Sequence, residues 1–190
     1  GDDSRVVLYD SFMSMWAARV WWMLRWVGFD RAAILDGGLK AWTDDGGGLS
    51  KEPASRPARR LTPKVRPALI AQQDEVRNAV DDDSVALIDT LPPDIYRGEQ
   101  TQYDRPGHIK GAANVCALDL LDQSGCFKPL DELASIHDGD RDTRTITYCG
   151  GGIMASASAF AMTRLGFKDV AVYTASLQEW AADPANPMEV

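Results

Sequence analysis

The residues best suited to chemistry in this chain form one short run, in which a cysteine, Cys149, is followed by three glycines. Glycine tolerates positive φ, so consecutive N–H groups can converge on one point, and a helix that begins there adds its positive end. A cradle of this kind holds an anion and stabilises a thiolate. We therefore predict Cys149 as a nucleophile. Its predicted anion cradle comprises Gly150, Gly151, Gly152, Ile153 and Met154.

The segments on either side are predicted to hold this run at the edge of a sheet. Residues 145–148 are β-branched or aromatic, which favours a strand ending at Tyr148, and residues 155–165 contain good helix formers without proline or glycine. In an open α/β sheet, ligands bind where the strands end. The alternative for Cys149 is a structural role beside a flexible loop, since free cysteines are commonly buried.

Two other chemistries fit the run less well. Residues 150–155 match the dinucleotide pattern G-x-G-x-x-A, but that site needs an acidic residue at the end of the next strand. The strand predicted at residues 170–173 is followed by Thr174 instead. A cysteine phosphatase would place an arginine where this chain has Ala155. Without a cation in the loop, a phosphate dianion would bind weakly.

The composition narrows the class of protein. A formal net charge of −8 argues against nucleic acid as a partner. No apolar run reaches membrane-spanning length, because Arg19 and Arg25 interrupt the tryptophan-rich segment, so we expect no membrane partner. The three cysteines are not spaced as zinc ligands, and we expect neither a metal nor another cofactor. We expect a cytoplasmic protein with reduced thiols, the alternative being a Cys116–Cys126 disulfide.

The chain contains two copies of one unit. Residues 5–42 align with residues 144–180 when one residue is dropped from the loop, and the alignment pairs Tyr9 with Tyr148. We therefore expect the strand–loop–helix–strand unit to occur twice. In the first copy Asp10 takes the place of the cysteine, so that copy is predicted to have lost both the nucleophile and the anion cradle.

The two copies differ in what precedes them. Residues 68–143 come before the strand of the second copy, whereas only eight residues precede Tyr9 in the first. Because so few strands cannot close a core, we expect a further amino-terminal segment of roughly 70 residues that completes the first domain. The predicted layout is the C-terminal part of an inactive domain at residues 1–43, a linker at 44–67 and a catalytic domain at 68–190. The linker, rich in glycine, proline and arginine, is either solvated or a basic patch.

Further candidate residues lie between the linker and the cysteine. We expect a helix at residues 71–80 and a strand at Val85–Asp89, which ends at the same sheet edge as Cys149. Arg97, in the loop that follows, is predicted to bind a substrate carboxylate or sulfonate. The alternative for Arg97 is an ion pair with Glu99 or Asp104.

Two more side chains are predicted to support the site. Asp89 closes the strand beside Cys149, and His108 precedes a short strand expected at residues 114–116. The alternative for His108 is a structural one, in which its hydrogen bonds fix the turn. His137, in a polar helix-to-loop stretch, carries no predicted role.

Residues 144–180 and the run Gly107–Asn114 resemble the active-site and G-H-I-x-G-A signatures of the rhodanese superfamily. The duplicated layout resembles the tandem-domain thiosulfate and 3-mercaptopyruvate sulfurtransferases, over essentially the whole chain. The resemblance implies an α/β fold with two rhodanese-like domains, each a mainly parallel five-stranded sheet flanked by helices, the first of them incomplete here. It also implies that Cys149 takes a sulfane sulfur from a donor, holds it as a persulfide and passes it to cyanide or a thiol.

Departures from the family pattern leave the donor open between thiosulfate and 3-mercaptopyruvate. The loop Gly-Gly-Gly-Ile-Met lacks the cations typical of the thiosulfate enzymes and the hydroxyls typical of the mercaptopyruvate enzymes. Leu91 stands where the family usually has a donor-binding arginine, whereas Arg97 matches a second substrate arginine of the mercaptopyruvate type. The family's catalytic aspartate and histidine from the first domain would lie in the expected amino-terminal segment. The predicted function is sulfur transfer through Cys149; the alternative is a non-catalytic rhodanese-like module that binds sulfur or a protein.

Overall fold

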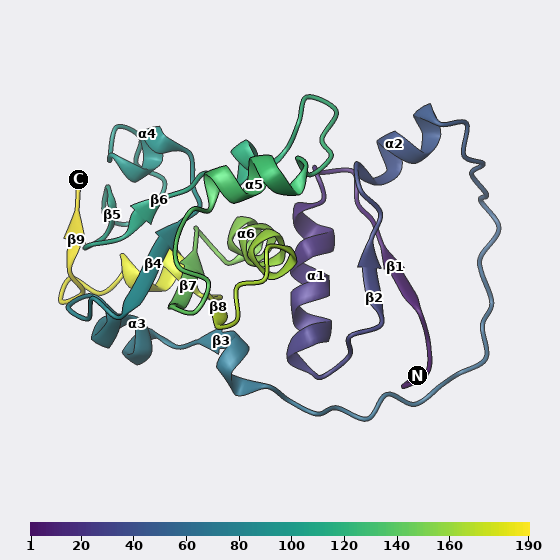
Figure 1. Ribbon diagram of the computed structural model, residues 1–190, viewed down its shortest axis with the longest axis horizontal. Coiled ribbons are helices and arrows are strands. Elements are labelled where there is room, and N and C mark those ends of the chain that lie inside the picture. The colour runs from purple at the N-terminus through teal and green to yellow at the C-terminus, as the bar shows by residue number, and fades with distance from the viewer.

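The computed structural model describes residues 1–190, and a five-stranded sheet forms the framework of its second half, at the left of Figure 1. The strand order is β3-β8-β7-β4-β6, and every pairing is parallel. The long strands are rich in valine, isoleucine and threonine, as expected for a sheet covered on both faces. The strands are β3 (Ile70–Ala71), β4 (Val85–Asp89), β6 (Ala113–Asn114), β7 (Arg144–Tyr148) and β8 (Val170–Tyr173).

The predicted strands at residues 85–89 and 170–173 are confirmed, and two neighbouring predictions need correction. The helix expected at residues 71–80 begins later, at Gln73, because Ile70 and Ala71 pair with β8. The strand expected at 114–116 lies one residue earlier and ends at Asn114, which pairs with Asp89, the last residue of β4. The helices of this half are α3 (Gln73–Ala79), α4 (Pro93–Tyr96), α5 (Leu130–Ile136), α6 (Ile153–Arg164) and α7 (Ser176–Trp180).

The first repeat has the same local order as the second. It runs β1 (Val6–Leu8), α1 (Met15–Trp26), β2 (Ala32–Ile34) and α2 (Gly38–Asp44), which matches β7, α6, β8 and α7. β1 and β2 pair in parallel as a two-stranded sheet. Residues 47–66 contain no helix or strand and follow a long arc from α2 to the second half (Figure 1).

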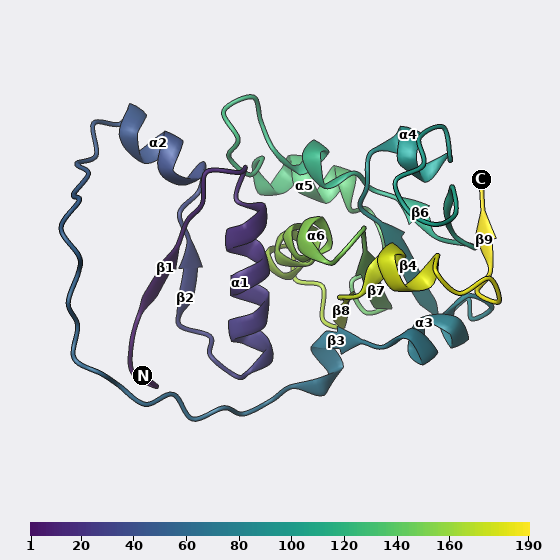
Figure 2. The ribbon, with the colours of Figure 1, turned by 180° about the vertical axis from the view of Figure 1, so that it is seen from behind.

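The equivalent helices of the two repeats pack against each other. α1 lies against α6, which in turn covers β7 and β8, so the molecule is layered as small sheet, α1, α6 and large sheet (Figures 1 and 2). Trp22 of α1 is 1% exposed and belongs to the main hydrophobic core, which otherwise consists of residues from the second half. Its Nε1 donates to the carbonyl of Leu69 at 2.9 Å. The first repeat is therefore part of the packing around the large sheet.

A small antiparallel pair of strands joins the C-terminal end of the chain to the second half. β5 (His108–Ile109) pairs with β9 (Met188–Glu189). None of the helices is both long and apolar enough to cross a membrane.

His137, which has no role predicted from sequence, is buried in the structure. It is 3% exposed, its Nε2 lies 3.3 Å from the hydroxyl of Ser158 on α6, and its ring packs edge-on against Phe167. Burial lowers the pKa of His137 to about 4, because the imidazolium would lose its hydration. The helix-to-loop segment after α5 is thus anchored by a histidine that stays neutral at physiological pH.

This buried histidine predicts a specific acid sensitivity. Its folded pKa lies below that of the unfolded chain, so the unfolded state binds the extra proton, and stability falls as the pH drops from about 6.5 to about 4. We expect His137→Gln to remove about 3 kcal/mol of this pH-dependent loss. Urea unfolding of both proteins at pH 7, 5.5 and 4 measures the difference. Equal acid sensitivity of the two proteins would contradict a buried neutral His137.

Candidate functional site

The cysteine loop lies between the carboxyl end of β7 and the first turn of α6, as the sequence predicts. Cys149 is 3% exposed, and its Sγ accepts the N–H of Gly152 at 3.0 Å. Gly152 adopts a left-handed conformation, with φ of +79°, and caps α6. The loop N–H groups without a hydrogen bond inside the protein are those of Gly150, Gly151, Ile153 and Met154. These donors lie in the same loop as the sulfur, at the positive end of a twelve-residue helix, an arrangement suited to an anion.

The start of α7 holds the loop from behind. The hydroxyl of Ser176 accepts the Cys149 N–H at 3.1 Å and donates to the Tyr173 carbonyl at 2.7 Å. The carbonyls of Cys149 and Gly150 accept the N–H groups of Leu177 and Gln178. These hydrogen bonds fix the loop on the start of α7 and leave its other N–H groups free to bind an anion.

Sequence reasoning missed Ser176, although the repeat contains a signal for it. Ser176 is fully buried with φ of +55°, a left-handed conformation that is uncommon for a residue with a side chain. Its counterpart in the first repeat is Gly38, whose φ is +61°. A serine where the other copy has a glycine indicates that its hydroxyl is needed there.

Gly152 tolerates no side chain, which gives a testable prediction. A Cβ at this position would lie 2.9 Å from both the Thr174 carbonyl oxygen and Nη1 of Arg19, in addition to the strain of positive φ. We expect Gly152→Ala to destabilise the protein by about 2–4 kcal/mol. The matched control is Gly166→Ala, which has φ of +86° with open space around its Cβ and should cost about 1 kcal/mol. Urea unfolding compares them; equal losses would show that the contacts at Gly152 are unimportant.

Asp89 is buried beside the loop, at the end of the neighbouring strand β4. Its Oδ1 accepts the Leu91 N–H at 2.8 Å, whereas its Oδ2 is buried without a hydrogen-bond partner. Burial raises the pKa of Asp89 to about 6, although the hydrogen bond from the Leu91 N–H opposes the shift. Asp89 is therefore a carboxyl group that gains or loses its proton near neutral pH, one strand away from Cys149.

Tyr103, which sequence reasoning also missed, covers the loop from the other side. A Cβ at Gly150 would overlap the Tyr103 hydroxyl, so the absence of a side chain at Gly150 permits this close approach. Burial raises the pKa of Tyr103, and the negative charges of Cys149 and Asp89 raise it further. The phenol thus stays protonated and can donate a hydrogen bond near the sulfur.

Three other residues singled out in the sequence make no hydrogen bond or ion pair with the loop. Arg97 follows α4, is exposed, and makes a two-pronged ion pair with Glu99, at 2.7 and 3.1 Å. Leu91 is buried in the main core. His108 stacks on the Tyr96 ring at 3.7 Å, and its Nδ1 lies 2.8 Å from the Tyr96 carbonyl oxygen. The contacts of Arg97 and His108 are those of the structural alternatives; their roles toward a substrate remain predictions.

Arg19, on α1 of the first repeat, reaches the loop of the second. Its Nη1 lies 3.5 Å from the Gly152 carbonyl oxygen, and the guanidinium is close enough to Cys149 for a thiolate there to stabilise its charge. Half-burial lowers the pKa of Arg19, which remains a cation. The sequence signal was its position, because Arg19 lies on the helix face formed by Met15, Ala18 and Trp22, which are all buried.

The first repeat keeps an anion cradle, which corrects the prediction that it had lost one. Asp10 occupies the position of the cysteine, and its carboxylate accepts the N–H groups of Phe12 at 2.8 Å, Ser14 at 3.0 Å and Ala17 at 2.7 Å. The Asp10 carbonyl accepts the Leu39 N–H, as the Cys149 carbonyl accepts that of Leu177. Only the nucleophile is lost, because the loop can bind its own carboxylate without glycines.

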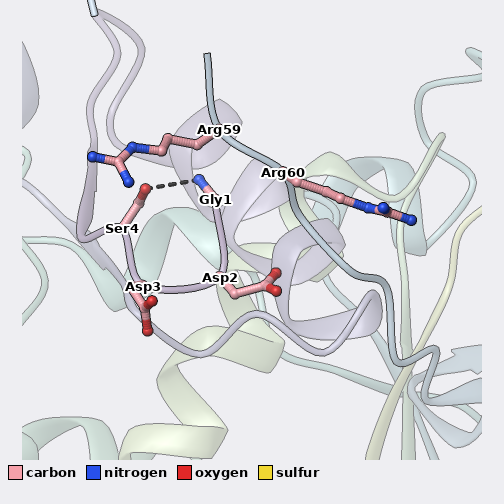
Figure 3. A pocket seen from close by; sticks show the side chains of 6 residues that line it. All are labelled: Gly1, Asp2, Asp3, Ser4, Arg59 and Arg60. Carbon is pink, nitrogen blue, oxygen red and sulfur yellow. Dashed lines mark hydrogen bonds between the residues drawn. The ribbon is translucent and has the colours of Figure 1, made fainter. Parts of the chain in front are cut away.

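A polar pocket of about 430 Å³ lies elsewhere on the molecule, where residues 1–4 approach Arg59 and Arg60 (Figure 3). The two arginine side chains extend in opposite directions, and the Gly1 nitrogen donates to the Ser4 hydroxyl at 2.7 Å (Figure 3). No cysteine or histidine lines this pocket. The Cys149 loop is therefore the better candidate for catalysis. Of the three cysteines, none is in a disulfide.

Comparison with known proteins places this fold and loop in one family. A family model described as a rhodanese-like domain matches residues 1–45 and 72–183. A curated relative from Pseudomonas aeruginosa, named probable 3-mercaptopyruvate sulfurtransferase, is 32% identical over 98% of this chain and 68% of its own length. A putative thiosulfate sulfurtransferase, SseB from Mycobacterium tuberculosis, is 33% identical over 98% of this chain and 67% of its own. The chain belongs to the rhodanese-like domain family.

Solved structures agree with this placement. The crystal structure of SseA from Escherichia coli, described as a 3-mercaptopyruvate sulfotransferase, superposes with a TM-score of 0.82 and 29% identity over 93% of this chain and 68% of that chain. Wild-type EanB superposes with a TM-score of 0.87 over 98% of this chain, at 24% identity, and so shares the fold. The present chain spans about half the length of EanB, 50%.

Proposed function

We propose that this protein is a sulfurtransferase, in which Cys149 accepts a sulfane sulfur from thiosulfate or 3-mercaptopyruvate and passes it to a thiophilic acceptor such as cyanide or a thiol. The observation that carries the proposal is the Gly152 N–H bound to the Cys149 sulfur at 3.0 Å, at the amino-terminal end of α6. The names of the relatives from P. aeruginosa and M. tuberculosis support the same chemistry.

Sulfur is taken up by nucleophilic displacement. The Cys149 thiolate attacks the outer sulfur of thiosulfate, a new S–S bond forms, the old S–S bond breaks, and sulfite leaves with the electron pair. With 3-mercaptopyruvate the C–S bond breaks instead; the electron pair goes to the methylene carbon, which takes the thiol proton to give pyruvate. Either donor leaves a persulfide anion on Cys149, and neither reaction needs an external oxidant or reductant.

The loop then holds the new anion. The terminal sulfur lies one bond beyond Sγ, and the unpaired N–H groups of the loop, with the helix terminus, are the donors available to it. We assign this role to Gly150, Gly151, Ile153 and Met154. Attack by cyanide or a thiolate on the terminal sulfur breaks the S–S bond, releases thiocyanate or a new persulfide, and restores the Cys149 thiolate.

Supporting roles follow from burial. Asp89, with its pKa raised to about 6, and the protonated Tyr103 are the groups near the loop that can exchange or donate a proton during turnover. His108 and Arg97 are proposed to act at a greater distance, His108 by fixing the turn beside Tyr96. Arg97 is held by Glu99, so it would have to leave that ion pair to bind a donor carboxylate.

Intact mass spectrometry tests the proposal directly. The protein is incubated separately with thiosulfate and with 3-mercaptopyruvate, and is then treated with cyanide. We expect a gain of about 32 Da on Cys149, the mass of one sulfur, which cyanide removes. The donor that gives the faster gain is the preferred one. No gain from either donor in folded protein would overturn the proposal and favour a rhodanese-like module that binds without catalysis.

A further inference from the structure

The proposed reaction brings negative charges together, and the loop itself has no cation to offset them. A thiolate must approach thiosulfate, a dianion, or the carboxylate of 3-mercaptopyruvate. Residues 150–155 contain no lysine or arginine, and Leu91 is an apolar side chain in the core. Arg97 is already neutralised by Glu99. Unless another positive charge lies nearby, repulsion would slow the attack.

Arg19 is the cation that meets this need from outside the loop. It touches the loop at Gly152, where its Nη1 lies 3.5 Å from the carbonyl oxygen. No carboxylate pairs with it, although other arginines such as Arg66 and Arg144 have ion-pair partners. A half-buried arginine without a counterion is costly unless an anion binds there during function.

The position of Arg19 is fixed by packing that is independent of the loop. It projects from α1, which lies against α6 and is anchored by the buried Trp22 three residues further on. The first repeat, which has no nucleophile of its own, thus places a guanidinium next to the nucleophile of the second. Its forked N–H groups suit the oxygen atoms of a sulfonate or a carboxylate.

We infer that Arg19 binds the anionic group of the sulfur donor, the sulfonate end of thiosulfate or the carboxylate of 3-mercaptopyruvate, and so completes the Cys149 site from the first repeat. This inference rests on the proposed function and adds to it a residue outside the catalytic half. When the thiolate displaces sulfite, the charge on the leaving group stays next to the guanidinium throughout the step. Arg19 therefore lowers both the repulsion on approach and the barrier to departure.

Donor kinetics of Arg19→Met and Arg19→Lys test this role. Loss of a charge-assisted contact should raise KM for thiosulfate about 10- to 100-fold in Arg19→Met, with partial recovery in Arg19→Lys. A neutral trisulfide has no anionic group. Cys149 attacks its outer sulfur to form a mixed disulfide and releases a persulfide anion, and the rate of this step should change less than about twofold. Arg25→Met, on the same helix but paired with Asp30, is the matched control and should leave KM for thiosulfate unchanged.

A binding measurement separates this inference from the proposed function. In a Cys149→Ser background no sulfur can be transferred, and titration calorimetry with sulfite should show about tenfold weaker binding when Arg19→Met is added. Equal sulfite affinities, or equal losses of rate with thiosulfate and with the trisulfide, would overturn the role of Arg19. Absence of persulfide in the unaltered protein, with Arg19-dependent sulfite binding intact, would instead overturn the sulfurtransferase proposal alone.

Discussion

Cys149→Ser is expected to lower sulfur transfer by at least about three orders of magnitude while leaving the fold intact. A serine hydroxyl is not ionised at neutral pH and cannot form the S–S bond on which the cycle depends. The substitution is nearly isosteric, and the backbone bonds of residue 149 to Ser176 and Leu177 do not involve its side chain. Thiocyanate formation from thiosulfate and cyanide measures activity, and circular dichroism checks the fold.

The matched control for this loss is another cysteine of the same chain. Cys126 is partly exposed, lies between the 3-10 helix Ala117–Leu120 and α5, and takes no part in the Cys149 loop. Cys126→Ser should keep full activity, and a mass gain on donor treatment should still map to Cys149. If sulfur transfer survives in Cys149→Ser and disappears in Cys126→Ser, the nucleophile is Cys126 and the assignment of Cys149 is refuted.

Trp22→Ala is expected to have the largest effect on stability, about 3–5 kcal/mol. The indole is 1% exposed, lies in the main core, and donates to the Leu69 carbonyl at 2.9 Å. Truncation would leave a cavity between α1 and the second half and an unpaired carbonyl. Urea unfolding followed by circular dichroism gives the change in the free energy of unfolding, provided that the dependence of this free energy on urea concentration is the same in both proteins.

Trp16→Ala provides the comparison, because it lies on the same helix with 52% exposure. It should change the free energy of unfolding by less than about 0.5 kcal/mol. Similar losses for the two tryptophans would mean that α1 does not pack into the core as described. The comparison therefore tests whether the first repeat is held by the second half through Trp22.

Sequence patterns predicted the parts of the site that lie next to one another in the chain. The strand ending at Tyr148, the glycines and the following helix form a local motif, and the repeat predicted the equivalent segment around Asp10. The local motif and the repeat both depend on preferences of residues close together in the chain, which a single sequence shows.

The remaining parts depend on contacts between distant segments. Arg19 and Gly152 are 133 residues apart in the chain, and only the packing of α1 on α6 brings them together. Tyr103 lies in a loop without periodicity, so no local pattern indicates that it covers Gly150. The cradle around Asp10 has no glycine signature in the sequence, because Met13 and Ser14 adopt positive φ there.

The carboxylate of Asp10 makes the first loop insensitive to the catalytic cycle. In the second loop the bound group gains and loses one sulfur atom in each proposed cycle, whereas the first loop always holds the same covalently attached anion. That loop leads directly into α1, and α1 carries Arg19. The two copies of the unit therefore have different proposed roles. The second copy carries the reacting cysteine, and the first, whose loop is always occupied by Asp10, holds the positive charge of Arg19 at a constant position beside it.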